Sequence, residues 1–216
     1  MPSASQQRGF DLVEAARGLR RLDSELARWM RRLGTLSPDL RWTQRLDLVD
    51  ALARAILYQQ LSGKAAATIV GRVEAVIGQP RLNARALSGA DDASLRACGV
   101  SANKLRALRD LSQHALERRI PSASQLARWD NERIIESLTA VRGIGRWTVE
   151  MLLMFRLGRP DVFAMDDLGL RKGIQRLDRL ATMPSARQAA ERACAWSPYR
   201  TLASLYLWRI ADFPAD

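Results

Sequence analysis

The segment NERIIESLTAVRGIGRWTVEMLLMF, residues 131–155, decides the fold class of this chain. Its first part repeats apolar residues at helical spacing, among them Ile134 and Leu138, which predicts one buried helical face. A second apolar stripe at helical spacing follows the two closely spaced glycines of the segment. We expect Gly143 and Gly145 to supply the positive φ and the close backbone approach that a tight turn needs. The segment is therefore predicted to form a helix, a short hairpin and a second helix.

The rest of the chain shows the same helical periodicity. Segments 44–60 and 101–117 repeat apolar residues at i, i+3 and i+4, and a further helix is expected to begin near Ser62. Ser122 and Ser185 each follow a proline at the head of a helical run, where a hydroxyl caps a helix well. Because no segment alternates with period two, no sheet is expected. We predict an all-α protein of roughly ten helices on the usual scale of helix and loop lengths.

The balance of charges points to a polyanionic partner. The chain has 34 Lys and Arg against 23 Asp and Glu, a formal net charge of +11. Such an excess serves either solubility or the binding of nucleic acid, and the second reading is favoured. Most of the positive charge is Arg, which suits bidentate phosphate contacts. The first residues lack the apolar segment of a signal peptide and no run is long enough to span a membrane, so a cytoplasmic protein without a membrane partner is expected.

Several chemistries are disfavoured by the few cysteines and histidines. The two cysteines, Cys98 and Cys194, lie far apart in the sequence and are expected to be reduced thiols. His114 is the only histidine, and its neighbours predict an exposed helix face. A zinc site therefore lacks ligands, and a four-cysteine iron–sulfur cluster is excluded. A Ser-His-Asp or Cys-His mechanism would need His114 as its base.

The hairpin and the segment after it are candidate functional elements. A Gly-x-Gly turn at a helix N-terminus presents backbone N–H groups that suit a phosphate, and Arg142 and Arg146 flank this turn; an ordinary αα-hairpin is the alternative. A loop with a glycine and a proline then leads to the adjacent Asp166 and Asp167. One aspartate suffices as a helix N-cap. The other carboxylate is available to stabilise positive charge that develops on a sugar.

Residues 138–173 resemble the signature of the helix-hairpin-helix, Gly/Pro-loop, aspartate superfamily of DNA glycosylases. Within it the sequence is most similar to the 3-methyladenine DNA glycosylase II branch. Segments 54–70, 95–112 and 196–210 resemble further parts of that family, so that the similarity spans residues 44–211 in the family's order.

The resemblance implies how the chain is organised. Residues 1–216 would form a single all-α glycosylase domain made of two helical lobes around a DNA-binding cleft. The helix-hairpin-helix and the Gly/Pro-Asp loop would occupy about 131–178. Composition does not place the boundary between the lobes.

The resemblance also implies the chemistry. It makes Asp167 the catalytic carboxylate and leaves Asp166 as the helix cap. A carboxylate in a dry pocket stabilises an oxocarbenium-like transition state and orients the attacking water. Trp147 takes the position where superfamily members that also cleave the backbone carry a lysine, which attacks the sugar. An indole there suits a flipped, electron-deficient base by stacking and cation–π attraction.

Further site residues follow from the same resemblance. The base pocket would be lined by Trp147, Met151, Trp208 and Tyr58. DNA would be bound by Gly143, Gly145, Arg142 and Arg146 at the hairpin, and by Gln60 as the wedge that fills the gap left by a flipped nucleotide. No cofactor is expected, although the hairpin would hold a structural monovalent cation through the backbone carbonyls of Thr139, Val141 and Ile144.

Together these features predict a monomeric, monofunctional DNA glycosylase. Its partner would be damaged duplex DNA, from which it would excise 3-methyladenine, 7-methylguanine or similar bases by base flipping and N-glycosidic hydrolysis in base excision repair. One alternative is a non-catalytic helix-hairpin-helix module that binds DNA or damage. Another is a bifunctional glycosylase/lyase, against which the absence of a lysine at position 147 argues.

Overall fold

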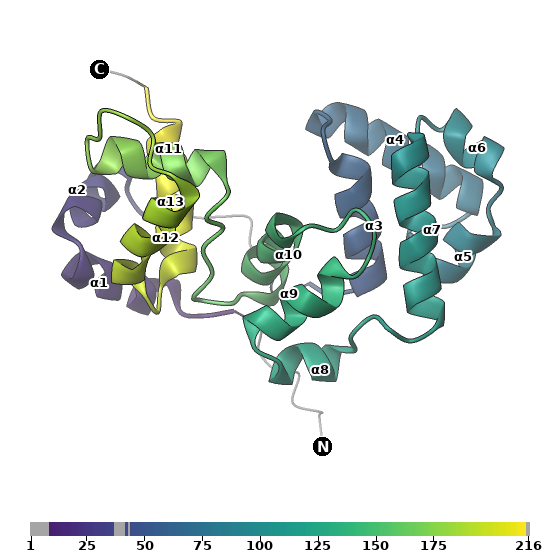
Figure 1. The fold of residues 1–216 in the computed structure, drawn as a ribbon, viewed down its shortest axis with the longest axis horizontal. Helices are drawn as coiled ribbons and strands as arrows, with labels where there is room; N and C mark the ends of the chain where they lie inside the picture. The colour runs from purple at the N-terminus through teal and green to yellow at the C-terminus, as the bar shows by residue number, and fades with distance from the viewer. Residues whose placement is uncertain (1–8, 37–41, 43, 215–216) are drawn as a thin grey trace. The chain divides into compact units, whose positions relative to one another are not determined.

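The computed structural model describes residues 9–36, 42 and 44–214, and within them all regular structure is helical (Figure 1). This confirms the predicted all-α fold. The described residues form thirteen α-helices, more than the roughly ten expected. The excess arises because α5 (Ala84–Gly89), α6 (Asp92–Ala97) and α8 (Ala123–Arg128) are short helices that show too few turns for a periodic pattern.

The helices divide between two compact units. One unit comprises residues Arg45–Val149, and the described residues before and after that stretch form the other. We call them the hairpin unit and the aspartate unit, after the predicted site elements that each contains.

The hairpin unit is built around α7 (Ala102–Leu116). This helix packs on α3 (Leu48–Tyr58), α5 and α6, while α3 also packs on α4 (Gly63–Ile77). The core lies between these helices, and its fully buried side chains include Leu52, Ile56, Val73, Leu108 and Leu111.

The aspartate unit is built around α13 (Arg200–Ala211), most of whose residues are buried. A helix that is apolar on all sides must be covered on all sides. Three helices that contact α13 supply that cover: α1 (Leu12–Leu22), α2 (Ser24–Leu33) and α11 (Leu168–Leu177). The remaining long helix, α12 (Ala186–Ala193), packs on α11.

Local capping chemistry sets several helix starts, as the sequence predicts. Ser62 accepts a hydrogen bond from the backbone of Ala65 at the start of α4. Ser122 and Ser185 each form a capping box with a glutamine three residues later. None of the helices in the described segments combines the length and the hydrophobicity needed to cross a membrane.

His114 is buried, so the prediction of an exposed helix face is wrong for this residue. Its side chain is only 9% exposed, and Arg119 Nη1 lies 2.6 Å from its Nε2. The cause is the chain reversal after α7. Arg118 adopts positive φ, and the backbone N–H of Arg119 donates to the His114 carbonyl, so that the Arg119 side chain returns to the Nε2 atom of the imidazole.

Candidate functional site

The predicted hairpin lies between α9 (Asn131–Thr139) and α10 (Arg146–Leu152). Its tip is a β-turn in which the Ile144 N–H donates to the Val141 carbonyl at 3.1 Å. Gly143 occupies the third position of this turn with φ of 79°, the value that a type II turn requires there. Gly145 does not have positive φ, so only one of the two glycines fulfils that expectation.

The charged groups of the hairpin are already partly engaged. The Arg146 guanidinium forms a two-point ion pair with Glu132 on α9, with N–O distances of 2.9 and 2.5 Å. That contact lowers the pKa of the Glu132 carboxyl. The backbone N–H of Arg142 donates to Asp110 on α7 at 2.7 Å, while its side chain is exposed. The Arg142 side chain is thus exposed, whereas its N–H is committed to the protein.

Residues Tyr58–Leu61 form a second turn in the hairpin unit, which we call the wedge turn. Leu61 N–H donates to the Tyr58 carbonyl, and the backbone angles of Gln59 (φ −53°, ψ 133°) with the positive φ of Gln60 (57°) match a type II turn. A side chain at positive φ costs about 1–3 kcal/mol, so this conformation needs support from its surroundings. The Gln60 side chain is exposed, as is the predicted pocket residue Tyr58, at 42%.

Asp167 is the N-cap of α11, not Asp166 as expected. Its Oδ1 accepts a hydrogen bond from the Leu170 N–H at 2.9 Å, and its backbone is extended. Asp166 is exposed at the preceding position. The helix begins at Leu168, and the capping position is therefore the second aspartate of the pair.

The Asp167 carboxylate also receives the indole N–H of Trp208 from α13. Trp208 Nε1 lies 2.9 Å from Asp167 Oδ1, and the Trp208 ring stacks on Phe155 at a centroid distance of 5.9 Å. Sequence reasoning placed Trp208 in a base pocket but missed this hydrogen bond, because the two residues are 41 positions apart in the sequence. One carboxylate oxygen is thus oriented by two donors.

Glycines on α11 make this contact possible. A Cβ atom on Gly169 would lie 2.8 Å from Trp208 Cδ1 and 3.1 Å from Asp167 Oδ1. One turn later, a Cβ on Gly173 would overlap the Leu207 carbonyl oxygen and lie 2.8 Å from its carbon. Because α11 lacks side chains at these two points, α13 approaches closely enough for Trp208 to reach Asp167.

The Gly/Pro loop that leads to Asp167 is fastened to the start of α13, by residues that sequence reasoning missed. Asp161 forms a two-point ion pair with Arg200, with N–O distances of 2.7 and 2.9 Å. The buried Thr201 hydroxyl donates to the Arg159 carbonyl at 2.6 Å and accepts from the Val162 N–H at 3.1 Å. These contacts fix the loop on the same helix that carries Trp208.

The Asp161 ion pair predicts a pH-dependent loss of stability. Burial favours the protonated form, but the hydrogen bonds from Arg200 and Ser197 prevail and hold the pKa of Asp161 below its ordinary value of 3.8. Because the pKa is lower in the folded protein than in the unfolded chain, the ionised Asp161 stabilises the fold above about pH 4. This stabilisation is lost as the pH falls through the pKa of the folded protein. Asp161→Asn is therefore expected to reduce the free energy of unfolding by about 2 kcal/mol at pH 7. Urea unfolding at pH 7 and pH 3 tests this, because the difference in free energy of unfolding between wild type and variant should be smaller at pH 3. An equal difference at both pH values would contradict the prediction.

The remaining predicted site residues lie on or beside α10. Trp147 is the second residue of this helix and is 48% exposed, and Met151 is half-buried further along it. The helix continues as a π-helix over Leu153–Leu157.

The predicted cation ligands lie at the end of α9 and in the hairpin turn. Thr139, at the end of α9, donates its hydroxyl to the Ile135 carbonyl, and the Val141 carbonyl accepts from Ile144 N–H within the turn.

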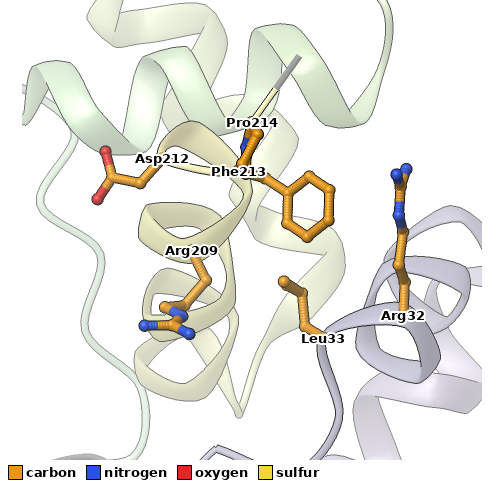
Figure 2. A pocket seen from close by; sticks show the side chains of 6 residues that line it. All are labelled: Arg32, Leu33, Arg209, Asp212, Phe213 and Pro214. Carbon is orange, nitrogen blue, oxygen red and sulfur yellow. The ribbon is translucent and has the colours of Figure 1, made fainter. Parts of the chain in front are cut away.

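A pocket of about 350 Å³ lies elsewhere in the aspartate unit, at the end of α13 (Figure 2). The Arg32 guanidinium lies 4.4 Å from the centroid of the Phe213 ring. Arg32 and Arg209 lie on opposite sides of Phe213 and point apart, so they do not converge on one ligand. Across the described segments, no three His, Cys, Asp or Glu side chains are grouped so that they could hold a metal ion.

Comparison with known proteins identifies the family. The HhH-GPD superfamily of base excision DNA repair proteins matches residues 53–198. DNA-3-methyladenine glycosylase 1 of Schizosaccharomyces pombe is 35% identical over 206 residues, which cover 94% of this chain and 90% of that protein.

Solved structures of DNA glycosylases also match this chain. The fission yeast 3-methyladenine DNA glycosylase Mag1 in complex with abasic DNA matches with a TM-score of 0.79 at 36% identity, covering 91% of this chain and 95% of that one. A DNA-3-methyladenine glycosidase from Bacillus halodurans matches with a TM-score of 0.82 at 34% identity, covering 92% and 89%. This chain belongs to the HhH-GPD superfamily of base excision DNA repair proteins.

Proposed function

We propose that this protein is a monofunctional DNA glycosylase that excises alkylated bases such as 3-methyladenine and 7-methylguanine from duplex DNA. The single observation that carries the proposal is the Asp167 carboxylate, oriented on one oxygen by the Leu170 N–H and the Trp208 N–H. Relatives that match nearly the whole chain are named as 3-methyladenine glycosylases, which supports the choice of substrate.

In the proposed reaction Asp167 acts on the sugar of a flipped nucleotide. As the bond between C1′ and the base nitrogen breaks, its electron pair leaves with the base and positive charge develops on the sugar. The Asp167 carboxylate stabilises that charge and orients a water, which adds to C1′ and releases a proton. An alkylated purine is already cationic, so it departs as a neutral base without a strong general acid.

The exposed Trp147 is proposed to stack on the flipped base. Its indole face attracts a cationic base by about 0.5–2 kcal/mol. Met151, Tyr58 and Trp208 are proposed to complete the pocket wall. The absence of a lysine at position 147 supports attack on the sugar by water rather than by an amine that would form a Schiff base.

The hairpin is proposed to bind the DNA backbone. The Arg142 side chain and the backbone at Gly143 and Gly145 are exposed, and the net charge of +11 favours a polyanion. A monovalent cation would be held by the carbonyls of Thr139, Val141 and Ile144. These neutral oxygen donors suit such an ion, and the Val141 carbonyl keeps a second lone pair beside its bond to Ile144 N–H. We further propose that the protein acts as a monomer in the cytoplasm.

Base release from methylated duplex DNA tests the proposed function. Released bases would be identified by mass spectrometry after incubation with the wild-type protein, and 3-methyladenine and 7-methylguanine are the expected products. Intact DNA binding without release would favour the non-catalytic alternative. A covalent DNA adduct trapped by borohydride would instead show the lyase chemistry of the bifunctional alternative.

Trp208→Phe is expected to slow base release without weakening DNA binding. Phenylalanine keeps an aromatic ring against Phe155 but removes the N–H that orients Asp167. A hydrogen bond to a charged group is worth about 1.5–3 kcal/mol, so kcat should fall about tenfold to a hundredfold while KM stays near wild type. Single-turnover kinetics measure this. Trp129→Phe, which lies outside the proposed site, is the matched control, and equal losses in both variants would refute the role of the N–H.

A further inference from the structure

The wedge turn and the hairpin are joined by a direct hydrogen bond within the hairpin unit. Gln59 Nε2 donates to the Gly143 carbonyl at 2.8 Å, across 84 positions of sequence. Gln59 is the second residue of the wedge turn and directly precedes Gln60. Gly143 is the third residue of the hairpin turn. One side chain thus ties together the two turns that are proposed to touch DNA.

Side chains of helix α7 form hydrogen bonds to both segments. Lys104 Nζ donates to the Leu57 carbonyl at 2.7 Å, at the end of α3 where the wedge turn begins. Burial of this amine lowers the pKa of Lys104. Asp110 accepts the Arg142 N–H at 2.7 Å in the hairpin. Lys104 and Asp110 are six residues apart on α7, which places them about 120° apart around the helix axis.

The residue midway between them on α7 sets how closely the hairpin approaches. Ala107 lies against Gly143, where an added Cβ would be only 3.1 Å from the Ala107 Cβ. The hairpin turn is therefore seated on α7 by packing as well as by the Asp110 hydrogen bond. The Gly143 carbonyl that Gln59 contacts has a fixed position.

The conformation of the wedge turn requires such an anchor. Gln60 has positive φ, a backbone conformation that residues other than glycine and asparagine rarely adopt, and its side chain is exposed. Strained positions of this kind persist only where neighbouring contacts over-determine them. The fixed contact of Gln59 immediately before Gln60 supplies that constraint.

We infer that Gln59 is a positioning residue that couples phosphate binding at the hairpin to insertion of Gln60 into the duplex. The two turns form one preorganised element, so that a hairpin seated on the backbone presents Gln60 to the gap left by the flipped nucleotide. This inference rests on the proposed function, which makes Gln60 the wedge and the hairpin a backbone contact.

Binding to two matched duplexes tests the coupling. One duplex carries a tetrahydrofuran abasic analogue and the other is undamaged, and Kd is measured for both with the full chain. Gln59→Met keeps the side-chain length and removes the donor. It is expected to weaken binding to the abasic duplex about tenfold while changing binding to the undamaged duplex less than about twofold, because a lost preorganisation affects only the inserted state. Gln113→Met on α7, whose amide donates to the exposed Glu117, is the control and should change neither value.

A double-mutant cycle separates positioning from general stability. Gln60→Ala should cost about tenfold in affinity for the abasic duplex in the wild-type background and less than about twofold in the Gln59→Met background, since residues that act as a unit are not additive. Additive losses, or equal losses on both duplexes, would overturn the inference. If Gln59→Met does not fold by circular dichroism, Gln59→Glu, which sets a carboxylate against the Gly143 carbonyl, replaces it.

The wild-type protein distinguishes failure of the inference from failure of the proposed function. No preference of the wild type for the abasic duplex would remove the proposed wedge, and the inference with it. A preference that survives in Gln59→Met would overturn the inference alone and leave the proposed function standing.

Discussion

Asp167→Asn is expected to lower the rate of base release by about 10³-fold, which corresponds to about 4 kcal/mol of transition-state stabilisation. Asparagine has nearly the same shape, and its side-chain oxygen accepts hydrogen bonds from the Leu170 N–H and the Trp208 N–H as the aspartate does. Asparagine is also as good an N-cap as aspartate, so α11 should remain intact. The variant therefore removes the negative charge and little else.

The neighbouring aspartate provides the matched control for this variant. Asp166→Asn makes the same change of charge one residue earlier, at an exposed position that does not cap the helix. Single-turnover release of methylated bases should fall only for Asp167→Asn, while both proteins keep the wild-type melting temperature. Equal losses of activity in the two variants would mean that net charge matters and that Asp167 has no special role.

Gly173→Ala is expected to destabilise the aspartate unit by about 3 kcal/mol. The new Cβ would overlap the Leu207 carbonyl of α13, and two packed backbones cannot separate locally without disturbing the contacts around them. Alanine favours a helix over glycine by about 1 kcal/mol, which offsets only part of this cost. Because α11 also carries Asp167, activity should fall together with stability.

A glycine in an open position makes the comparison quantitative. Gly71 lies within α4, and a Cβ atom there would meet nothing within 4 Å. Gly71→Ala is therefore expected to stabilise the protein by about 0.5–1 kcal/mol through helix propensity alone. Urea unfolding of both variants gives the two free energies. A Gly173→Ala protein as stable as Gly71→Ala would show that α11 and α13 do not approach closely in solution.

Elements governed by local chemistry were predictable from the sequence. The starts of α4, α8 and α12 follow from serine caps, and the hairpin turn follows from Gly143, whose positive φ is cheap for glycine alone. Burial of Ile134 and Leu138 on α9 follows from helical spacing. Each of these depends on residues no more than a few positions apart.

Features that depend on tertiary contacts escaped prediction. Asp166 and Asp167 satisfy the same capping rule, and only the position at which α11 starts selects between them. His114 is buried by a chain reversal that its helix does not reveal. The contact of Gln59 with Gly143 leaves no trace in either local segment, because neither residue is unusual for its own turn.

One oxygen of Asp167 accepts two hydrogen bonds, from the Leu170 N–H and the Trp208 N–H. This decides which substitution should be used to make an inactive protein that binds an intact lesion. Alanine at this position would leave the Leu170 amide and the Trp208 indole without their acceptor, and loss of a cap alone costs about 1 kcal/mol. Such a protein would hold rearranged side chains around position 167 and report a misleading pose for the damaged nucleotide. Asparagine keeps both donors satisfied, so it is the substitution that would trap the substrate in the geometry of the working enzyme.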